Sequence, residues 1–152
     1  MKIDTQKIKE LREKTGAGIN DCREALLESK GDLKKAEEIL QKKGFEKALR
    51  KGDRETGQGL VESYVHAGRI GVLVELNCET DFVARTDEFK TLAHEIALQV
   101  SSMNPKNVDE LLEQEYIRDG SKTIQDLIKA AIAKLGENIV LGRFHRIEIG
   151  RE

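Results

Sequence analysis

Residues 77–89, NCETDFVARTDEF, gather a thiol, several carboxylates and two aromatic rings directly after the most apolar run of the chain. Thr80 is placed to cap a short helix whose first turn contains Asp81, Phe82 and Val83. An acidic side chain in a first turn suits the helix dipole. An aromatic side chain at the exposed start of a helix is typical of an interface hot spot. The alternative is that Phe82 packs beneath the neighbouring strands as part of the core.

A second cap residue, Thr86, follows Thr80 in the same stretch. Because Thr86 opens a longer helical pattern, the segment TDFVAR is predicted to form a single helical turn. We expect this turn to stand off the tip of the preceding hairpin, with Phe82 and Val83 available to a partner.

Sequence motifs for nucleotide, metal or nucleophilic chemistry are missing. The chain contains neither GxxxxGKS/T nor GxGxxG, and its three histidines fall on separate predicted elements without metal-ligand spacing. A nucleophile built from Cys78 and a histidine has no supporting motif, and a buried cysteine at a strand end is the simpler interpretation. The sequence therefore predicts a binding surface, with no cofactor, no metal and no enzyme activity.

The composition favours a soluble, cytoplasmic protein. Charged residues make up 36% of the 152 residues and leave a net charge of −2. The first 54 residues carry 15 basic and 11 acidic side chains, whereas the remainder carries 11 and 17, which indicates two modules with different surfaces. The chain opens without a signal-peptide pattern, and no apolar run approaches the roughly 18 residues of a membrane span. Its two lone cysteines are expected to be reduced.

Residues 1–44 have the pattern of three short helices, typical of a compact binding module. Thr5 is expected to cap the first helix, Asn20 or Asp21 the second, and Asp32 the third. Glycines after each pattern are expected to end the helices.

The third helix is expected to stop at Gly44, and the charged residues 45–57 to form a linker or short helix. Residues 58–152 begin with a predicted hairpin at 58–77, which turns at AGR. Two longer helices, a short helix at VDELLEQEY and a final strand follow. The fold class is therefore α+β, with helices packed over a three-stranded antiparallel sheet.

Three segments of the sequence resemble signature segments of the bacterial elongation factor Ts family. They are LREKTGAGINDCREAL at 11–26, ELNCETDFVARTDEF at 75–89 and AKLGENIVLGRF at 133–144. The resemblance covers nearly the whole chain, and the segments occur in the family's order. It implies a guanine nucleotide exchange factor for elongation factor Tu, the GTPase that delivers aminoacyl-tRNA to the ribosome.

The resemblance also assigns residues to a first contact with elongation factor Tu. It implies that the N-terminal helices form a ubiquitin-associated-like bundle that docks on the nucleotide domain of the partner. The docking face would include Leu11, Arg12, Ile19 and Asn20. Family members commonly carry Met at the last two of these positions, so Asn20 departs from the apolar pattern.

A second implied contact is the turn at 80–83. In the family, the Asp and Phe of this turn, here Asp81 and Phe82, wedge beside the partner's switch II helix and disturb its Mg²⁺ site. Leu135 and Gly136 match a further family contact near the phosphate side of the partner.

The chain is short for this family. Long members carry two related core subdomains, whereas this sequence has one, and its region between Met103 and Thr123 is very short even beside other short forms. Short forms of the family act as dimers. The terminal strand at 139–149 is predicted to be an exposed edge. We therefore expect a homodimer formed through the sheet or its neighbourhood.

Two alternative functions fit the same residues. A helical binding module fused to an unrelated α+β scaffold would bind another protein without changing nucleotide release. An RNA-binding accessory factor would use the basic cluster between Lys42 and Arg54. Acidic residues interrupt that cluster and no aromatic platform accompanies it, so direct contact with nucleic acid is not expected.

Overall fold

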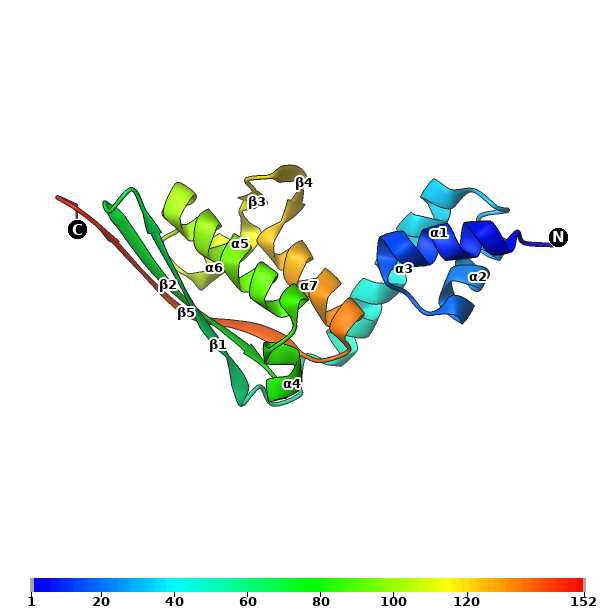
Figure 1. Cartoon of the computed structure of the whole chain (residues 1–152), viewed down its shortest axis with the longest axis horizontal. Helices are drawn as coiled ribbons and strands as arrows, with labels where there is room; N and C mark the ends of the chain where they lie inside the picture. Colours follow the sequence, from blue (N-terminus) through cyan, green and yellow to red (C-terminus); the bar gives the residue numbers. More distant parts are fainter. Residues whose placement is uncertain (1, 152) are drawn as a thin grey trace.

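Helices form the first third of the molecule, and an antiparallel sheet covered by helices forms the rest (Figure 1). The structure is a computed structural model that describes residues 2–151. Its elements are α1 (Thr5–Thr15), α2 (Ile19–Glu28), α3 (Leu33–Arg50), β1 (Gln58–His66), β2 (Ile70–Cys78), α4 (Asp81–Ala84), α5 (Asp87–Met103), α6 (Val108–Glu113), β3 (Glu115–Tyr116), β4 (Asp119–Thr123), α7 (Ile124–Leu135) and β5 (Ile139–Glu148). Within the described residues, no helix is long and apolar enough to cross a membrane.

The helices α1, α2 and α3 pack around a small apolar core and are called the N-terminal bundle below. Asp4 caps α1 and Gly18 precedes α2, so the predicted caps at Thr5, Asn20 and Asp21 are wrong: these residues lie inside the helices. The third helix has its predicted aspartate cap. The buried core of the bundle consists of Leu11, Cys22, Ala25, Leu26, Ala36 and Leu40.

The longest helix of the bundle, α3, carries the chain into the α+β part of the molecule. It continues through Gly44 to Arg50, so the predicted helix stop at Gly44 is wrong. The glycine instead permits close packing, because a Cβ atom at this position would lie 3.0 Å from Cβ of Ala133 in α7. Ala48, one turn further along α3, is buried with the residues of the sheet and its helices. The segment predicted as a linker or short helix therefore begins as helix, in continuation of α3.

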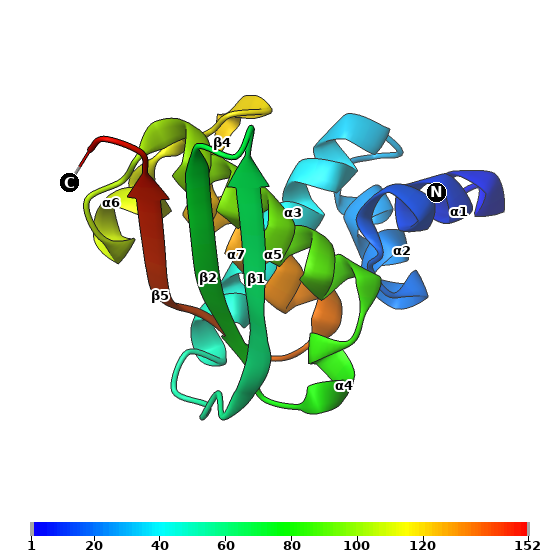
Figure 2. The same cartoon turned by 60° about the vertical axis from the view of Figure 1, so that its left-hand side comes forward.

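The strands β1, β2 and β5 form the predicted three-stranded antiparallel sheet in that order, with β5 at an edge. The β1–β2 hairpin turns at the predicted AGR, where Ala67 and Gly68 adopt positive φ. Figure 2 shows the strands in front and the helices behind them. Val72, Val74 and Leu76 point to the helix side and are buried against α5, while α6 and α7 cover β5. The predicted α+β class of this part is confirmed.

A second, two-stranded hairpin of β3 and β4 follows α6, and no sequence pattern predicts it. The predicted helix at VDELLEQEY is correspondingly shorter, because it ends at Glu113 and β3 begins two residues later. Gln99 of α5 is fully buried and fixes the hairpin by two hydrogen bonds. Its amide donates to the carbonyl of Glu115 and accepts from the amide of Ile117, each over 3.0 Å. A buried polar side chain thus replaces apolar packing at this end of α5.

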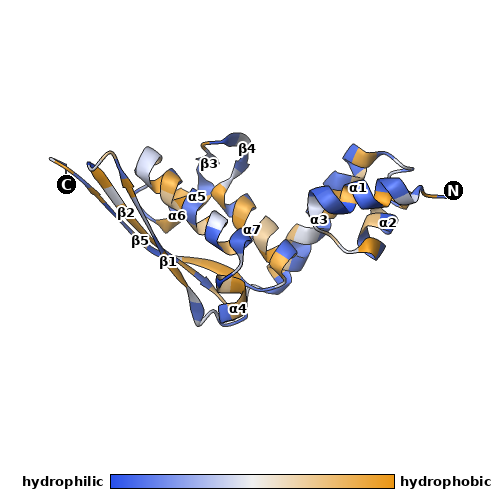
Figure 3. Ribbon diagram, in the orientation of Figure 1, coloured by the Kyte–Doolittle hydropathy of each residue, from blue (hydrophilic) through white to orange (hydrophobic). Residues whose placement is uncertain are grey.

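The buried apolar residues of the described part of the chain form two separate clusters. One is the bundle core described above, and the other extends from Ala48 to Leu141 around the fully buried Phe89. Figure 3 shows apolar residues following the inner sides of the helices in both parts. The division of the chain into a module at 1–44, a connecting segment at 45–57 and a core domain at 58–152 stays a proposal, because Ala48 of the connecting segment is buried in the second cluster.

Candidate protein-binding surface

The short helix α4 presents one large apolar side chain to solvent. Phe82 is 77% exposed, so the alternative that it packs beneath the strands is excluded. Thr80 caps the helix as predicted, its hydroxyl accepting a hydrogen bond from the amide of Val83 over 3.4 Å. Val83 itself is buried in the core cluster. The prediction that Val83 is available to a partner is therefore wrong, and this side chain anchors the turn.

The α4 turn lies at the open end of the β1–β2 hairpin rather than at its tip. Cys78, the last residue of β2, pairs with Gln58, the first of β1, and α4 begins three residues after Cys78. The hairpin tip with Ala67 is at the opposite end of the strands (Figure 2). The predicted position beside the tip is thus wrong, because the chain leaves β2 where β1 begins.

The carboxylate of Asp81 is directed along its own helix. It accepts a hydrogen bond from the guanidinium of Arg85 over 3.0 Å, one turn later, and both side chains are more than half exposed. An exposed ion pair of this kind contributes little to stability. Asp81 can therefore exchange its partner for a group on another molecule at small cost.

The end of α7 adjoins the α4 turn. Leu135 is half-buried, and Gly136 ends the helix in the left-handed region at φ 78°, as predicted. The next residue, Glu137, accepts hydrogen bonds from Thr80 over 2.9 and 2.6 Å. The structure thus brings together the two predicted stretches at 80–83 and 135–136.

No sequence pattern assigned a role to Glu137 or to its neighbour Asn138. The available signal was weak: polar residues directly follow a helix-ending glycine, where a turn alone would explain them. Their partners lie between 57 and 86 positions earlier in the chain, which only the fold reveals.

The predicted docking face on the bundle is exposed, with one exception. Arg12, Asn20 and Ile19 are accessible to solvent, the last with 56% of its surface exposed. Leu11 is fully buried in the bundle core, so the prediction that it lies on the docking face is wrong. The bundle lies at the other end of the molecule from the β1–β2 hairpin tip (Figure 1), apart from α4.

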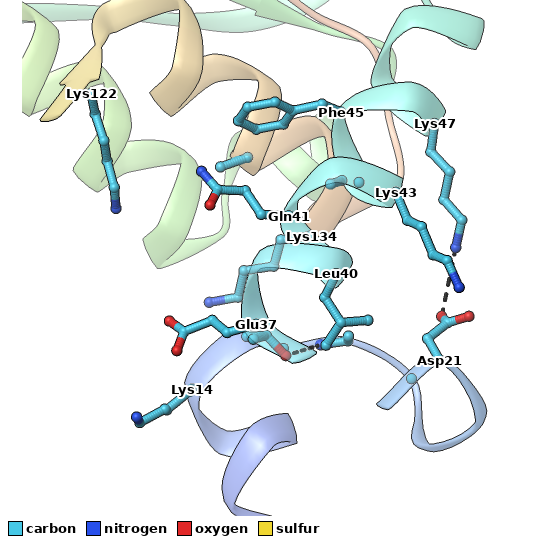
Figure 4. Close-up of a pocket in the computed structure, with 17 residues that line it drawn as sticks. Lys14, Asp21, Glu37, Leu40, Gln41, Lys43, Phe45, Lys47, Lys122 and Lys134 are labelled. Atoms are coloured by element: carbon cyan, nitrogen blue, oxygen red, sulfur yellow. Dashed lines mark hydrogen bonds and ion pairs between the residues drawn. The ribbon is translucent and has the colours of Figure 1, made fainter. Parts of the chain in front are cut away.

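A cavity of about 490 Å³ lies where the bundle meets α7. Figure 4 shows Lys14, Lys122 and Lys134 on one side of the cavity and Lys43 and Lys47 on the other. The ion pairs of these lysines are Lys47–Asp21 at 3.6 Å, Lys43–Glu28 at 3.8 Å, Lys43–Glu24 at 4.0 Å and Lys134–Glu88 at 3.7 Å. Carboxylates thus already partner part of the positive charge around this cavity.

The thiol of Cys78 lies behind the α4 turn and is fully buried. It donates a hydrogen bond to the carbonyl of Thr80 over 3.1 Å. Burial, with the nearby charge of Glu137, raises the pKa of Cys78, so the thiol is the stable form near neutral pH. This geometry disfavours a nucleophile here. Among residues 2–151, no three or more His, Cys, Asp or Glu side chains gather as a metal site would require.

An α+β core that holds an exposed aromatic side chain on a fixed turn has the form of a protein-binding module. Comparison with known proteins identifies which kind. The family model described as Elongation factor TS matches residues 79–152. An elongation factor Ts of Thermoanaerobacter sp. (strain X514) is 44% identical over 97% of this chain and 95% of its own length. Elongation factor Ts of Thermotoga neapolitana is 44% identical over the full length of both chains. This chain belongs to the elongation factor Ts family.

These alignments also show that a relative carries residues with no counterpart in this chain. The alignment with the Thermotoga neapolitana relative extends over 196 positions, whereas this chain has 152 residues. Because both chains are covered in full, the relative carries an internal stretch with no counterpart here. The region between Met103 and Thr123, where α6 and the β3–β4 hairpin directly follow α5, is the stretch that the sequence identified as short.

Proposed function

We propose that this chain is a cytoplasmic guanine nucleotide exchange factor that binds elongation factor Tu with GDP and promotes GDP release. The observation that carries the proposal is Phe82, exposed to 77% at the start of a helix that Thr80 caps. Membership of the elongation factor Ts family supports the choice of partner. No bond is made or broken in this function, so the protein is not an enzyme and needs no cofactor of its own.

Phe82 is the proposed wedge beside the switch II helix of the partner. An aromatic ring that remains in water costs free energy, and its transfer into an apolar site contributes roughly 1.5–3 kcal/mol. The buried Val83 fixes the turn from below, so that little conformational entropy is lost when the ring inserts.

Asp81 is proposed to act on the Mg²⁺ site of the partner. Its carboxylate is exposed and held only by the ion pair with Arg85, over 3.0 Å. A carboxylate brought near bound Mg²⁺ competes for the oxygen and water ligands that this ion prefers. We expect Asp81 to contribute less than Phe82 to the acceleration of GDP release, because its carboxylate must first give up the ion pair with Arg85.

The exchange mechanism follows from linkage between the two ligands of the partner. The wedge binds best when the Mg²⁺ and phosphate site of the partner is distorted, and nucleotide binds best when that site is intact. Bound factor therefore lowers the affinity for nucleotide, and bound nucleotide lowers the affinity for the factor by the same ratio. GDP then leaves, and GTP, which is in excess in the cell, binds and displaces the factor. Leu135 and Gly136, which adjoin the turn through Glu137, would contact the phosphate side.

The N-terminal bundle is proposed to dock on the nucleotide domain as a ubiquitin-associated-like module. Arg12, Ile19 and Asn20 are exposed near the α1–α2 turn and form the proposed face. Ile19 supplies its apolar centre, since Asn20 stands where relatives of this family commonly have an apolar side chain. The bundle contact would raise the affinity for elongation factor Tu, and the α4 turn would speed the release of GDP.

Release of a fluorescent GDP analogue from elongation factor Tu tests this function. The wild-type protein should accelerate release, and Phe82→Ala should reduce the acceleration about 10- to 100-fold, the rate equivalent of the lost insertion energy. Leu49→Ala is the matched control, because Leu49 is 70% exposed on α3, outside the proposed contacts. Binding without acceleration by the wild type would instead establish the alternative function, a binding module of another kind.

A homodimer formed through the open face of the sheet is also proposed. Val61, Val65, Leu73 and Ile147 are at least half exposed on the face opposite the helices, where a soluble monomer rarely gathers apolar side chains. We expect light scattering to give twice the mass of one chain, and Val65→Lys to give the mass of a single chain. A single-chain mass for the wild type at micromolar concentration would exclude the dimer.

A further inference from the structure

Two glutamates and the backbone beside each of them form a reciprocal clamp behind the α4 turn. Glu137 accepts hydrogen bonds from the amide and the hydroxyl of Thr80, over 2.9 and 2.6 Å. In the opposite direction, Glu79 accepts a hydrogen bond from the amide of Asn138 over 2.8 Å. Residues 79–80 and 137–138 therefore hold each other by hydrogen bonds to charged groups, which are the strong kind.

The clamp reaches a third segment of the chain. The side chain of Asn138 is almost fully buried and donates to the carbonyls of Gly52 and Arg54, over 3.3 and 2.8 Å. The guanidinium of Arg54 lies 3.6 Å from the carboxylate of Glu79. The segment that leaves α3 of the bundle is thus tied to the same site. The position of the α4 turn is fixed relative to both the end of α7 and the chain that leads from the bundle.

Thr80 is the link between the clamp and the exposed ring. Its hydroxyl donates to Glu137 over 2.6 Å and accepts from the amide of Val83 over 3.4 Å. The helix that carries Phe82 has only four residues, so its propensity cannot hold it in place. Its position must come from such tertiary bonds and from the burial of Val83 and Ala84.

We infer that Glu137 is a positioning residue for nucleotide exchange, which holds Thr80 so that Phe82 enters the partner at the required place. The inference rests on the proposed function. Glu137 acts through Thr80 and need not touch the partner. A wedge displaced by about an ångström loses much of its effect on rate while binding through the bundle persists. Removal of the Glu137 carboxylate should therefore lower the maximal rate of GDP release and change the affinity for elongation factor Tu less.

The test compares Glu137→Ala with Glu137→Gln. At saturating factor, Glu137→Ala should lower the maximal rate of GDP release about tenfold, whereas the half-saturating concentration should change by less than about threefold. The glutamine amide can accept from the Thr80 amide and donate to its hydroxyl, so Glu137→Gln should retain the rate within about threefold. An unchanged rate for Glu137→Ala, or equal loss in both variants, would overturn the inference.

Glu95→Ala is the matched control for general loss of stability. Glu95 is half-buried like Glu137, accepts a hydrogen bond from Tyr116 over 2.7 Å and forms an ion pair with Arg118 at 3.1 Å. Its partner Tyr116 belongs to the β3–β4 hairpin, which lies apart from α4 (Figure 1), so this variant should keep the wild-type rate of release.

Amide hydrogen exchange in the free protein decides the positioning role without elongation factor Tu. Glu137→Ala should speed exchange at the amides of Val83 to Thr86, and Glu137→Gln should restore their protection, with β1 unchanged in both. Unchanged protection in Glu137→Ala would overturn the role of Glu137. Absence of GDP release by the wild type would overturn the proposed function alone, since the amide result stands by itself.

Discussion

The bundle and the core domain each present one exposed apolar side chain in the first turn of a helix, but they hold it differently. Ile19 is 56% exposed on α2, whose N-terminal cap Gly18 makes no side-chain hydrogen bond. Phe82 is 77% exposed on α4, whose cap Thr80 is bonded to Glu137. Burial of Cys22, Ala25 and Leu26 in the bundle core holds the ten residues of α2, whereas the four residues of α4 bury less surface and are held in addition by the bonds to Glu137.

The two regions also differ in how much apolar surface supports them. Among residues 2–151, six buried side chains form the bundle core, and 19 form the core-domain cluster. A core of the smaller size is marginal on its own. The comparison therefore predicts that Phe82 has a fixed position on a stable core domain. It predicts that the N-terminal bundle, the proposed docking module, is less stable and more mobile.

The largest expected effect is that of Phe89→Ala in the core domain. Phe89 is fully buried at the start of α5, directly after the turn that carries Phe82. Its truncation should lower the free energy of unfolding by about 3–5 kcal/mol, because a large cavity remains in a dense core. Urea unfolding followed by circular dichroism measures this change. A loss below about 1 kcal/mol would contradict the stated difference between the regions.

Leu11→Ala makes the corresponding change in the bundle. Leu11 is fully buried there, and its truncation should cost about 2–3 kcal/mol. Because the bundle has its own cluster, we expect the α1 and α2 amides to lose protection from hydrogen exchange while those of α5 and β2 keep theirs. Equal loss of protection in both regions would show that they unfold as one unit.

Ile19→Ala tests the exposed side chain of the bundle and should have a smaller effect. The side chain is more than half exposed, so the stability of the free protein should change by less than about 0.5 kcal/mol. Affinity for elongation factor Tu should fall about fivefold, with the maximal rate of GDP release unchanged. Titration calorimetry and the release assay separate these quantities. A loss of maximal rate would assign Ile19 to the exchange step and remove the proposed division of roles.

The sequence predicted the elements far better than the contacts between them. The β1–β2 hairpin, the cap at Thr80 and the helix end at Gly136 follow from local residue types, and the structure confirms them. The helix stop predicted at Gly44 failed because a glycine that ends one helix permits close packing in another, here against Ala133. Local pattern alone does not distinguish the two roles.

The candidate site shows the same limit. Spacing placed Phe82 and Val83 in one turn, but only the fold shows that the first is exposed and the second buried. Glu137 and Thr80 are 57 positions apart, so no local pattern joins them. The β3–β4 hairpin is bonded to buried Gln99, a tertiary contact that the helical pattern predicted through Glu115 and Tyr116 could not reveal.

The smallest expected effect concerns Tyr116 at the β3–β4 hairpin and appears only at alkaline pH. Burial and its hydrogen bond to Glu95 raise the pKa of Tyr116 from its usual 10.0 to about 12. The folded state therefore retains the phenol proton longer than the unfolded state does. The contribution to stability is complete below pH 10 and is lost as the pH rises toward 12. After screening by solvent, we expect this loss to be below about 1 kcal/mol.

Tyr116→Phe isolates this contribution, because it removes the phenol and leaves the ring. The variant should be slightly less stable than wild type near neutral pH, as the bond to Glu95 is gone, and the difference should shrink above pH 10. Urea unfolding of both proteins across this pH range measures the difference. Tyr64→Phe, at the only other tyrosine, is the control. A constant difference across the range would show that the folded state does not raise the pKa of Tyr116 and would contradict this prediction.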